Sequence, residues 1–180
     1  MKNTLIQLRD DLLHLSTRHQ SLSNRELREK SQHIAEKRRE RLLSIIDIYE
    51  VKRCTCFDCG VFYVDSHTNE EIELSLFSSD GLDGGNTTYQ CVKCGKEGFI
   101  SVDNIVGTPK VAKSKQEQRE LESLLQIFHR LKYLPYHAQK FTDRAQFHVS
   151  ILVLLRKVEH TLIPFDFESF ISDIKEVKND

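Results

Sequence analysis

The sequence predicts an α+β protein that is mostly α-helical, with a small antiparallel β segment inserted into a helical core. Apolar residues recur every three or four positions before residue 53 and after residue 107, as they do along one face of a helix. Between these regions apolar and polar residues alternate, which is typical of strands. Only 7 glycines and 3 prolines occur among 180 residues, while 39% of the residues are hydrophobic and 29% are charged. This composition indicates a helix-rich globular chain with a sizeable core.

This pattern divides the chain into three expected parts. Residues 1–53 should form an N-terminal helix pair, residues 54–106 the β segment, and residues 107–180 a set of C-terminal helices that packs with the N-terminal pair. The helical core would then be continuous in space and interrupted in sequence. Two loosely linked halves are the alternative, because the basic segment from 107 to 116 is typical of a linker.

The N-terminal part is expected to be an antiparallel pair of helices. Leucines on one face mark a first helix over residues 3–19: Leu5, Leu8, Leu12 and Leu15. The sequence from Ser23 to Glu26 has the S-x-x-E form of a capping box and should begin a second helix that runs to about Tyr49. The loop between the helices is short, so they are expected to cover one another's apolar faces.

Three helices are expected in the C-terminal part. The first carries an apolar stripe from Leu121 to Leu131 and should end at Leu134-Pro135. The second should begin at Thr142-Asp143, and its dense apolar residues, Leu152 among them, predict the centre of the core. A last helix should follow Pro164.

Two matching cysteine motifs of the form C-x-x-C-G occupy residues 56–60 and 91–95, and we call them the knuckles. Two thiolates separated by two residues can bind one ion from a tight turn, and the following glycine allows a positive φ there. The four ligands would be Cys56, Cys59, Cys91 and Cys94. Four thiolates complete a tetrahedral shell, for which Zn²⁺ is the expected ion, with rubredoxin-like iron and an iron–sulfur cluster as alternatives. A closed shell has no position for water or substrate, so the metal is expected to be structural.

The β segment between and around the knuckles should consist of short strands near residues 61–64, 72–76 and 99–102, with a polar loop over 78–86. With its two knuckles it resembles a zinc ribbon over residues 54–102. The resemblance implies metal binding but no particular activity, since such ribbons serve in nucleic-acid enzymes, transcription machinery and protein adaptors. A fifth cysteine, Cys54, is interpreted as a bystander rather than as an alternate ligand or redox thiol, because the shell is complete without it.

Charge is unevenly distributed, although the net charge is only −1. Residues 54–100 contain two basic and eight acidic side chains. An acidic ribbon repels phosphate backbones, which favours a protein as its partner. The expected partner-binding residues are Glu71, Glu73 and Asp83.

The strongest basic patch lies on the predicted helix over residues 25–41. Its candidate contacts with nucleic acid are Arg38, Arg39 and Arg41. Glutamates are interspersed among these cations, and a mixed charge run is also typical of a solvated helix face with i,i+4 pairs.

Function is therefore expected to lie in binding rather than in catalysis. The chain has no nucleophile-elbow, zinc-protease or nucleotide-binding motif, and its 8 histidines are scattered. No apolar run approaches membrane length and the first residues lack a signal peptide, so a cytoplasmic protein without a membrane partner is expected.

The leading hypothesis is a non-enzymatic zinc-ribbon regulator or adaptor that binds a protein partner, in transcription or other nucleic-acid metabolism. The alternative is a transcriptional regulator that binds nucleic acid directly through the helix at 25–41, with the linker at 107–115. An enzyme whose residues meet only in three dimensions is a third, weaker class.

Overall fold

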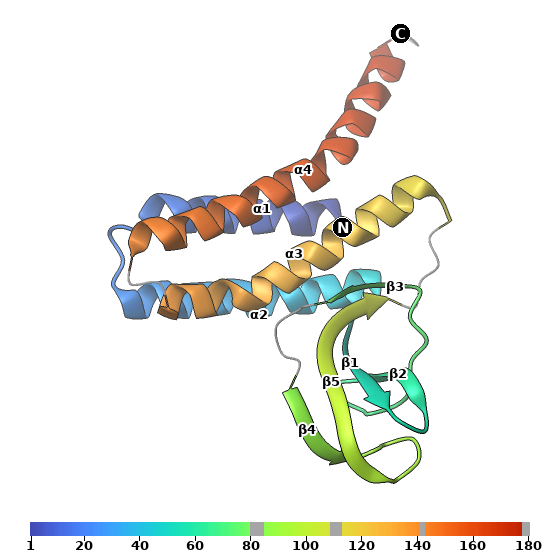
Figure 1. Ribbon diagram of the computed structural model, residues 1–180. Helices are drawn as coiled ribbons and strands as arrows, with labels where there is room; N and C mark the ends of the chain where they lie inside the picture. Colours follow the sequence, from blue (N-terminus) through green and yellow to red (C-terminus); the bar gives the residue numbers. More distant parts are fainter. Residues whose placement is uncertain (80–84, 109–112, 141–142, 178–180) are drawn as a thin grey trace. The chain divides into compact units, whose positions relative to one another are not determined.

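The computed structural model describes the backbone of residues 1–79, 85–108, 113–140 and 143–177, and the side chains of residues 1–77, 90–98, 101–108, 113–140 and 143–163. Within these ranges the chain forms four helices and a small antiparallel sheet, so the predicted class, α+β and mostly α, is confirmed (Figure 1). The helices are α1 (Lys2–Arg18), α2 (Asn24–Ile46), α3 (Lys115–Lys140) and α4 (Arg144–Val177). The strands are β1 (Tyr49–Cys56), β2 (Gly60–Asp65), β3 (Leu76–Ser79), β4 (Gly85–Gln90) and β5 (Glu97–Thr108). None of the described helices is both long enough and apolar enough to cross a membrane.

The chain divides into two compact units. The helical unit comprises Met1–Leu42 and Arg130–Asp180, and the sheet unit comprises Leu43–His129. The boundaries fall inside α2 and α3, so each of these helices contributes residues to both units.

The core of the helical unit is formed by one apolar face of each contributing helix. The expected leucine stripe of α1 is buried along its whole length, with side chains no more than 1% exposed: Leu5, Leu8, Leu12 and Leu15. Ile151 and Val158 of α4 are 0% exposed, and Leu131 of α3 is equally buried. Burial of these aliphatic side chains supplies the main driving force for the helices to associate.

Polar contacts join the end of α1 to the beginning of α4. His19 and His148 stack with their ring centroids 4.1 Å apart, and the Ser16 hydroxyl lies 2.8 Å from His148 Nε2. The Arg144 guanidinium donates to the backbone carbonyl of His19 and, at 3.1 Å, to the side-chain oxygen of Asn24. The C-terminal end of α1 therefore meets the N-terminal end of α4, and the two helices run antiparallel.

The beginning of α2 has the predicted capping box. The Ser23 hydroxyl accepts from the backbone N–H of Glu26 at 3.3 Å, and the Glu26 carboxylate accepts from the backbone N–H of Ser23 at 2.8 Å. The helix ends earlier than expected, at Ile46, because Asp47 has a φ of 47° and this left-handed conformation stops the helical hydrogen bonding. Tyr49, which was expected at the end of the helix, instead begins β1.

The two helix ends predicted from prolines are wrong. Pro135 lies inside α3, which continues for another turn to Lys140. A proline in a helix costs about 3 kcal/mol, but Leu134 and Ala138 are buried on either side of it, 2% and 6% exposed, and their burial offsets this cost. Pro164 likewise does not separate two helices, since α4 is continuous from Arg144 to Val177.

Leu152 was expected in the core and is instead 43% exposed. With 3.6 residues per turn, the buried face of α4 passes through Ile151, Leu155 and Val158, which are 0%, 6% and 0% exposed. Leu152 directly follows Ile151 in the sequence, and the rotation of the helix between the two residues places it outside this buried face. A dense apolar run thus contains more apolar residues than the core can cover.

The sheet unit is organised around β5, the long curved strand in Figure 1. One edge of β5 pairs with β1 over residues 101–107. Its other edge pairs first with β4 over residues 97–102 and then with β3 over residues 105–108. β2 completes the sheet by pairing with β1, and all of these pairings are antiparallel.

The predicted strands are only partly correct. Residues 61–64 and 99–102 do lie in strands, whereas the expected strand over 72–76 forms only from Leu76 onward. Gly85 and Asn86, which were expected in a polar loop, begin β4, and Asp80-Gly81 lies outside the described residues. Gly107 and Thr108, which were assigned to a flexible linker, are buried in β5.

The position of Gly107 explains the error about the linker. The side chain of Leu74 packs over its backbone so closely that a Cβ at residue 107 would come within 2.6 Å of Leu74 Cδ1. The glycine therefore serves a close approach within the sheet unit and not flexibility, because any larger residue would have to displace the leucine.

Candidate metal centre

Each knuckle forms the tip of a β-hairpin. Cys56 ends β1 and is paired in register with Gly60 of β2, so the first knuckle is the turn between these two strands. The second knuckle connects β4 to β5, which are paired up to Gln90 and Glu97. Because antiparallel pairing fixes both ends of each turn, the sheet holds all four cysteines in place.

The backbone of each knuckle has the conformation that the sequence predicted. Gly60 and Gly95 both have a φ of 73°, which residues other than glycine rarely adopt. In the second knuckle the N–H of Gly95 donates to the carbonyl of Cys91 at 2.8 Å, and the N–H of Cys91 donates to the carbonyl of Lys96 at 2.9 Å. These bonds close the turn around the sulfurs.

The four cysteines of the knuckles lie close together. Their sulfurs all lie within 4.8 Å of one another, with 3.8 Å between Cys56 and Cys94 and 3.9 Å between Cys59 and Cys91. A tetrahedral zinc site with Zn–S bonds of about 2.3 Å requires sulfurs about 3.8 Å apart. The four cysteines are therefore positioned to bind a metal ion, and the donor set fits the structural zinc type.

Local hydrogen bonds give the thiols different acidities. Burial raises the pKa of Cys91, but hydrogen bonds from the backbone of Cys94 and Lys93 outweigh it and bring this pKa down to about 7. The hydrogen bond with the Cys94 thiol, followed by burial, raises the pKa of Cys59 to about 12. An arriving cation would thus find one sulfur that ionises near neutral pH and would have to displace protons from others, which makes metal binding pH-dependent.

Two lysines lie near the sulfurs, Lys93 in the second knuckle and Lys96 directly after it. Lys93 Nζ lies 2.7 Å from Glu71 Oε1 and 5.6 Å from the centroid of the Phe62 ring. Lys96 Nζ lies 3.1 Å from Asp58 Oδ2, which links the two knuckles. The hydrogen bonds to these carboxylates, and to a lesser extent the nearby thiolates, raise the pKa of both lysines. Two ammonium groups therefore offset part of the negative charge that four thiolates would bring.

Cys54 lies outside the four-cysteine group. It is 6% exposed and its sulfur faces the carbonyl of Lys52 at 3.9 Å. It packs in a small apolar cluster with Cys56, Phe62 and Val64. Burial raises the pKa of this thiol, so it behaves as an apolar side chain within the sheet unit.

The residues after the first cysteine of each knuckle point away from the metal centre. Phe57 is 101% exposed and Val92 is 59% exposed. Both side chains are therefore accessible to another molecule. Neither residue was predicted from the sequence as part of a site, although an aromatic residue inside a C-x-x-C motif was a usable signal. We call Phe57 and Val92 the tip pair.

The predicted partner-binding residues do not have equal environments. The carboxylate of Glu71 forms an ion pair with Lys93, whereas the side chain of Glu73 is exposed. Asp83 lies outside the described residues.

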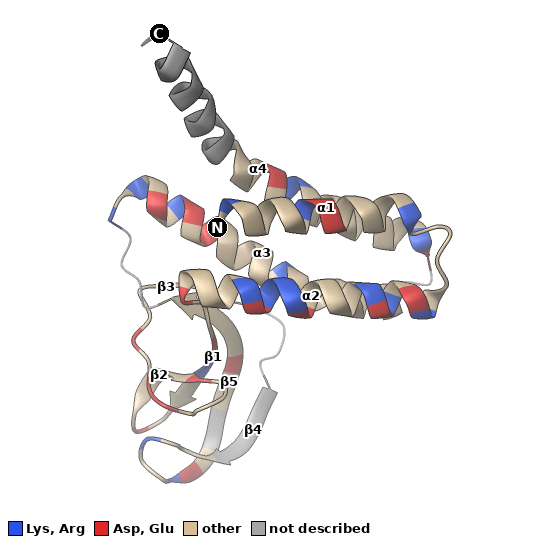
Figure 2. Cartoon of the chain, turned by 180° about the vertical axis from the view of Figure 1, so that it is seen from behind, with Lys and Arg blue, Asp and Glu red and all other residues tan. Residues whose placement is uncertain are grey.

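The predicted nucleic-acid residues on α2 also differ from one another. Arg38 is only 7% exposed, and its guanidinium donates to Asp11 at 2.7 Å and to Gln7 at 2.8 Å. Arg39 is half-buried and Arg41 is exposed. Figure 2 shows Lys and Arg side by side with Asp and Glu along this helix. Arg38 could reach a phosphate only by giving up a partly buried ion pair.

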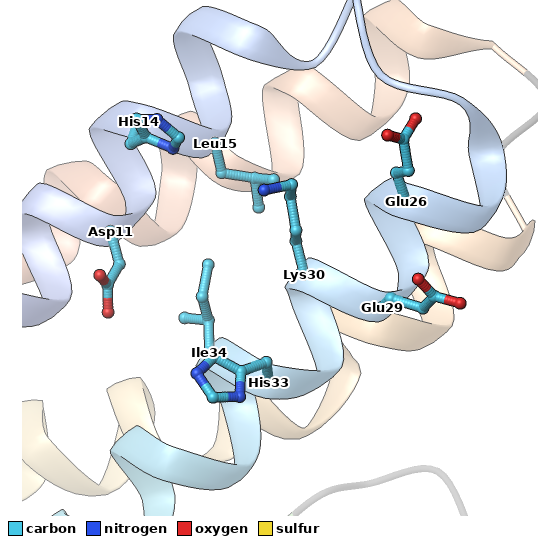
Figure 3. Close-up of a pocket in the computed structure, with 8 residues that line it drawn as sticks. All are labelled: Asp11, His14, Leu15, Glu26, Glu29, Lys30, His33 and Ile34. Carbon is cyan, nitrogen blue, oxygen red and sulfur yellow. The ribbon is translucent and has the colours of Figure 1, made fainter.

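A cleft of about 440 Å³ lies between α1 and α2 in the helical unit (Figure 3). The residues that line it are mixed in charge: Asp11, His14, Leu15, Glu26, Glu29, Lys30, His33 and Ile34. Asp11, Glu26 and Glu29 already bond to Arg38, Ser23 and Arg25. Each of the three carboxylates that line the cleft is therefore bonded to a neighbouring side chain.

Comparison with protein-family models, with curated proteins and with solved structures finds no match to this chain. The geometry of the four cysteines is therefore what identifies this site. That geometry supports a cysteine cluster able to bind a metal ion, within an α+β fold that is mostly helical.

Proposed function

We propose that this protein is a non-enzymatic adaptor or regulator in which Zn²⁺, held by Cys56, Cys59, Cys91 and Cys94, stabilises the sheet unit as a zinc ribbon and presents the tip pair to a protein partner. The observation that carries the proposal is the complete exposure of Phe57 on a hairpin that the four-cysteine centre would hold rigid. A rigid, exposed aromatic anchor is the type of residue that dominates the energy of protein interfaces.

The metal acts as a structural element in this proposal. Four sulfurs at tetrahedral spacing leave no coordination position for a substrate. The small apolar cluster of the sheet unit consists of residues around the cysteines, including Phe62 and Val64. This cluster around the knuckles is small, and in our proposal metal binding adds the stability that fixes the four-cysteine end of the sheet.

The tip pair supplies the binding energy. Burying a fully exposed phenylalanine in a partner's pocket contributes about 1.5–3 kcal/mol, and a rigid backbone reduces the entropy that binding costs. Pre-organisation also gives the metal its role in this proposal, because the ion would join the two hairpin tips and hold them in the conformation that the partner binds.

The charge around the tip selects the partner. Residues 54–100 carry two basic and eight acidic side chains, and Glu70, Glu73 and Glu97 are exposed in the structure. A partner that combines an apolar pocket with a basic rim is complementary to this surface. Basic rims of this kind are common on proteins of nucleic-acid metabolism, which is the setting we propose for this adaptor.

The test compares two exposed phenylalanines of the sheet unit. Phe57→Ser removes the anchor, whereas Phe77→Ser removes a side chain that is 48% exposed on β3 and serves as the matched control. Both variants should retain one Zn²⁺ per chain and the far-UV circular dichroism of the natural protein. Only Phe57→Ser should lose the proteins that a photo-crosslinker placed at residue 92 captures from a native lysate.

Two results would contradict the proposal. Protein purified without chelators that contains no stoichiometric metal would exclude the zinc ribbon. Equal capture by the Phe57→Ser and Phe77→Ser variants, both with metal bound, would show that the tip pair is not the docking surface.

A further inference from the structure

The outer face of α4 carries large apolar side chains that the helical unit does not cover. Val149 is 57% exposed, Leu152 43%, Val153 43% and Ile163 59%. The opposite face of the same helix is completely buried at Ile151. Large apolar side chains on the exposed face of a helix whose other face is already buried indicate a second contact surface.

Five exposed residues on this face follow the spacing of a coiled-coil seam, and we call them the α4 seam. They are separated by three, four, three and four positions: Val149, Leu152, Arg156, Glu159 and Ile163. This alternation keeps side chains on one line along a helix and is the repeat that lets two helices pack along their length.

The two charges in the middle of the seam are free to pair across an interface. Among the described residues, neither Arg156 nor Glu159 takes part in an ion pair or a hydrogen bond of its side chain, and both side chains are exposed. They have opposite sign and stand next to one another in the seam, with an apolar residue beyond each of them. The order is therefore apolar, basic, acidic, apolar from Leu152 to Ile163.

We infer that the α4 seam binds the α4 seam of a second copy of this chain, antiparallel and about a two-fold axis between residues 157 and 158. In this alignment Leu152 faces Ile163 of the second copy, and Arg156 faces Glu159 of the second copy. Symmetry repeats both contacts, so the interface has two apolar layers and two ion pairs.

The charges distinguish this arrangement from its alternative. Parallel pairing of two identical seams would place Arg156 opposite Arg156 and Glu159 opposite Glu159, and like charges in a seam oppose association. The antiparallel arrangement converts both repulsive contacts into attractive ones. Because the described seam spans only four turns of helix, its interface is small and the dimer should be weak, with a dissociation constant of roughly 0.1 mM.

Sedimentation equilibrium of the natural protein with zinc bound tests the inference. The weight-average mass should rise from 21.0 kDa at low micromolar concentration towards twice that value near millimolar concentration. Leu152→Ser should keep the mass at the monomer value throughout. Tyr136→Ser is the matched control, because Tyr136 is 50% exposed on α3, outside the seam, and its loss should leave the dimer intact.

Charge exchange tests the antiparallel alignment. Arg156→Glu and Glu159→Arg should each weaken the dimer at least tenfold, the double variant should regain it, and an equimolar mixture of the two single variants should form a heterodimer. Circular dichroism verifies that each variant keeps its helices. The inference would be overturned if the protein stayed monomeric at the highest concentration, which is also the result expected if a foreign helix covers this face. It would equally be overturned by a dimer that Leu152→Ser does not affect. A double variant that dimerises as weakly as the single variants would contradict the antiparallel alignment.

Discussion

Replacing Ile151 by alanine should destabilise the helical unit much more than replacing its neighbour Leu152. Ile151 is 0% exposed, and truncation to alanine removes three carbon atoms, which costs about 2.4 kcal/mol in transfer free energy at about 0.8 kcal/mol each. The cavity left behind adds to this, so the total loss should be about 3–4 kcal/mol. Leu152 loses the same number of carbons but is already 43% exposed, and its truncation should cost about 1 kcal/mol.

Urea unfolding followed by far-UV circular dichroism measures this difference. The protein should be kept at low micromolar concentration, where a dimer through α4 does not contribute, and with zinc in excess so that the sheet unit remains folded. Equal slopes of the free energy against urea concentration would validate the comparison between the two variants. If Leu152→Ala destabilised the chain as much as Ile151→Ala, the assignment of the buried face of α4 would be wrong.

Three further perturbations test other parts of the structure. Cys91→Ser should abolish stoichiometric zinc binding and unfold the sheet unit, whereas Cys54→Ser should leave the metal in place; elemental analysis of both proteins decides whether the ligand set is right. Asp11→Ala leaves the buried guanidinium of Arg38 without its carboxylate and should lower the free energy of unfolding by about 1–3 kcal/mol, while an unchanged unfolding midpoint would argue that the pair contributes nothing. Burial, followed by the neighbouring imidazole, lowers the pKa of His148, so the unfolded chain binds a proton more readily. Stability should therefore fall as the pH drops below about 6.5, the ordinary histidine value. The melting temperature of His148→Gln, measured by thermal unfolding, should depend less on pH than that of the natural protein if the assignment holds.

Local signals in the sequence predicted the parts of this protein that depend on local chemistry. The capping box at Ser23 and Glu26 and the positive φ after each knuckle follow from a few adjacent residues, and the structure contains them. The convergence of the four cysteines was predictable for a related reason, because their spacing satisfies one ion.

Features that depend on distant contacts were predicted less well. β4 begins at Gly85, where the sequence indicates a turn, because pairing with β5 outweighs the local preference. α3 continues through Pro135 because buried neighbours offset the cost of the proline. The exposure of Leu152 depends on which face of α4 meets the other helices, and periodicity in an apolar run that covers both faces cannot decide this.

The two knuckles are far apart along the chain, and this would give a bound metal ion a role comparable to that of a cross-link. Cys59 and Cys91 are separated by 32 positions, so an ion bound to both closes a large loop that contains β2, β3 and β4. Closing a loop of this length in the unfolded chain removes conformational entropy worth about 4 kcal/mol, by the same relation that applies to a disulfide. Unlike a disulfide, this cross-link can be withdrawn by a competing chelator without any change of oxidation state. The availability of free zinc would then control whether the loop is closed, and the surface on the knuckles would exist only while it is.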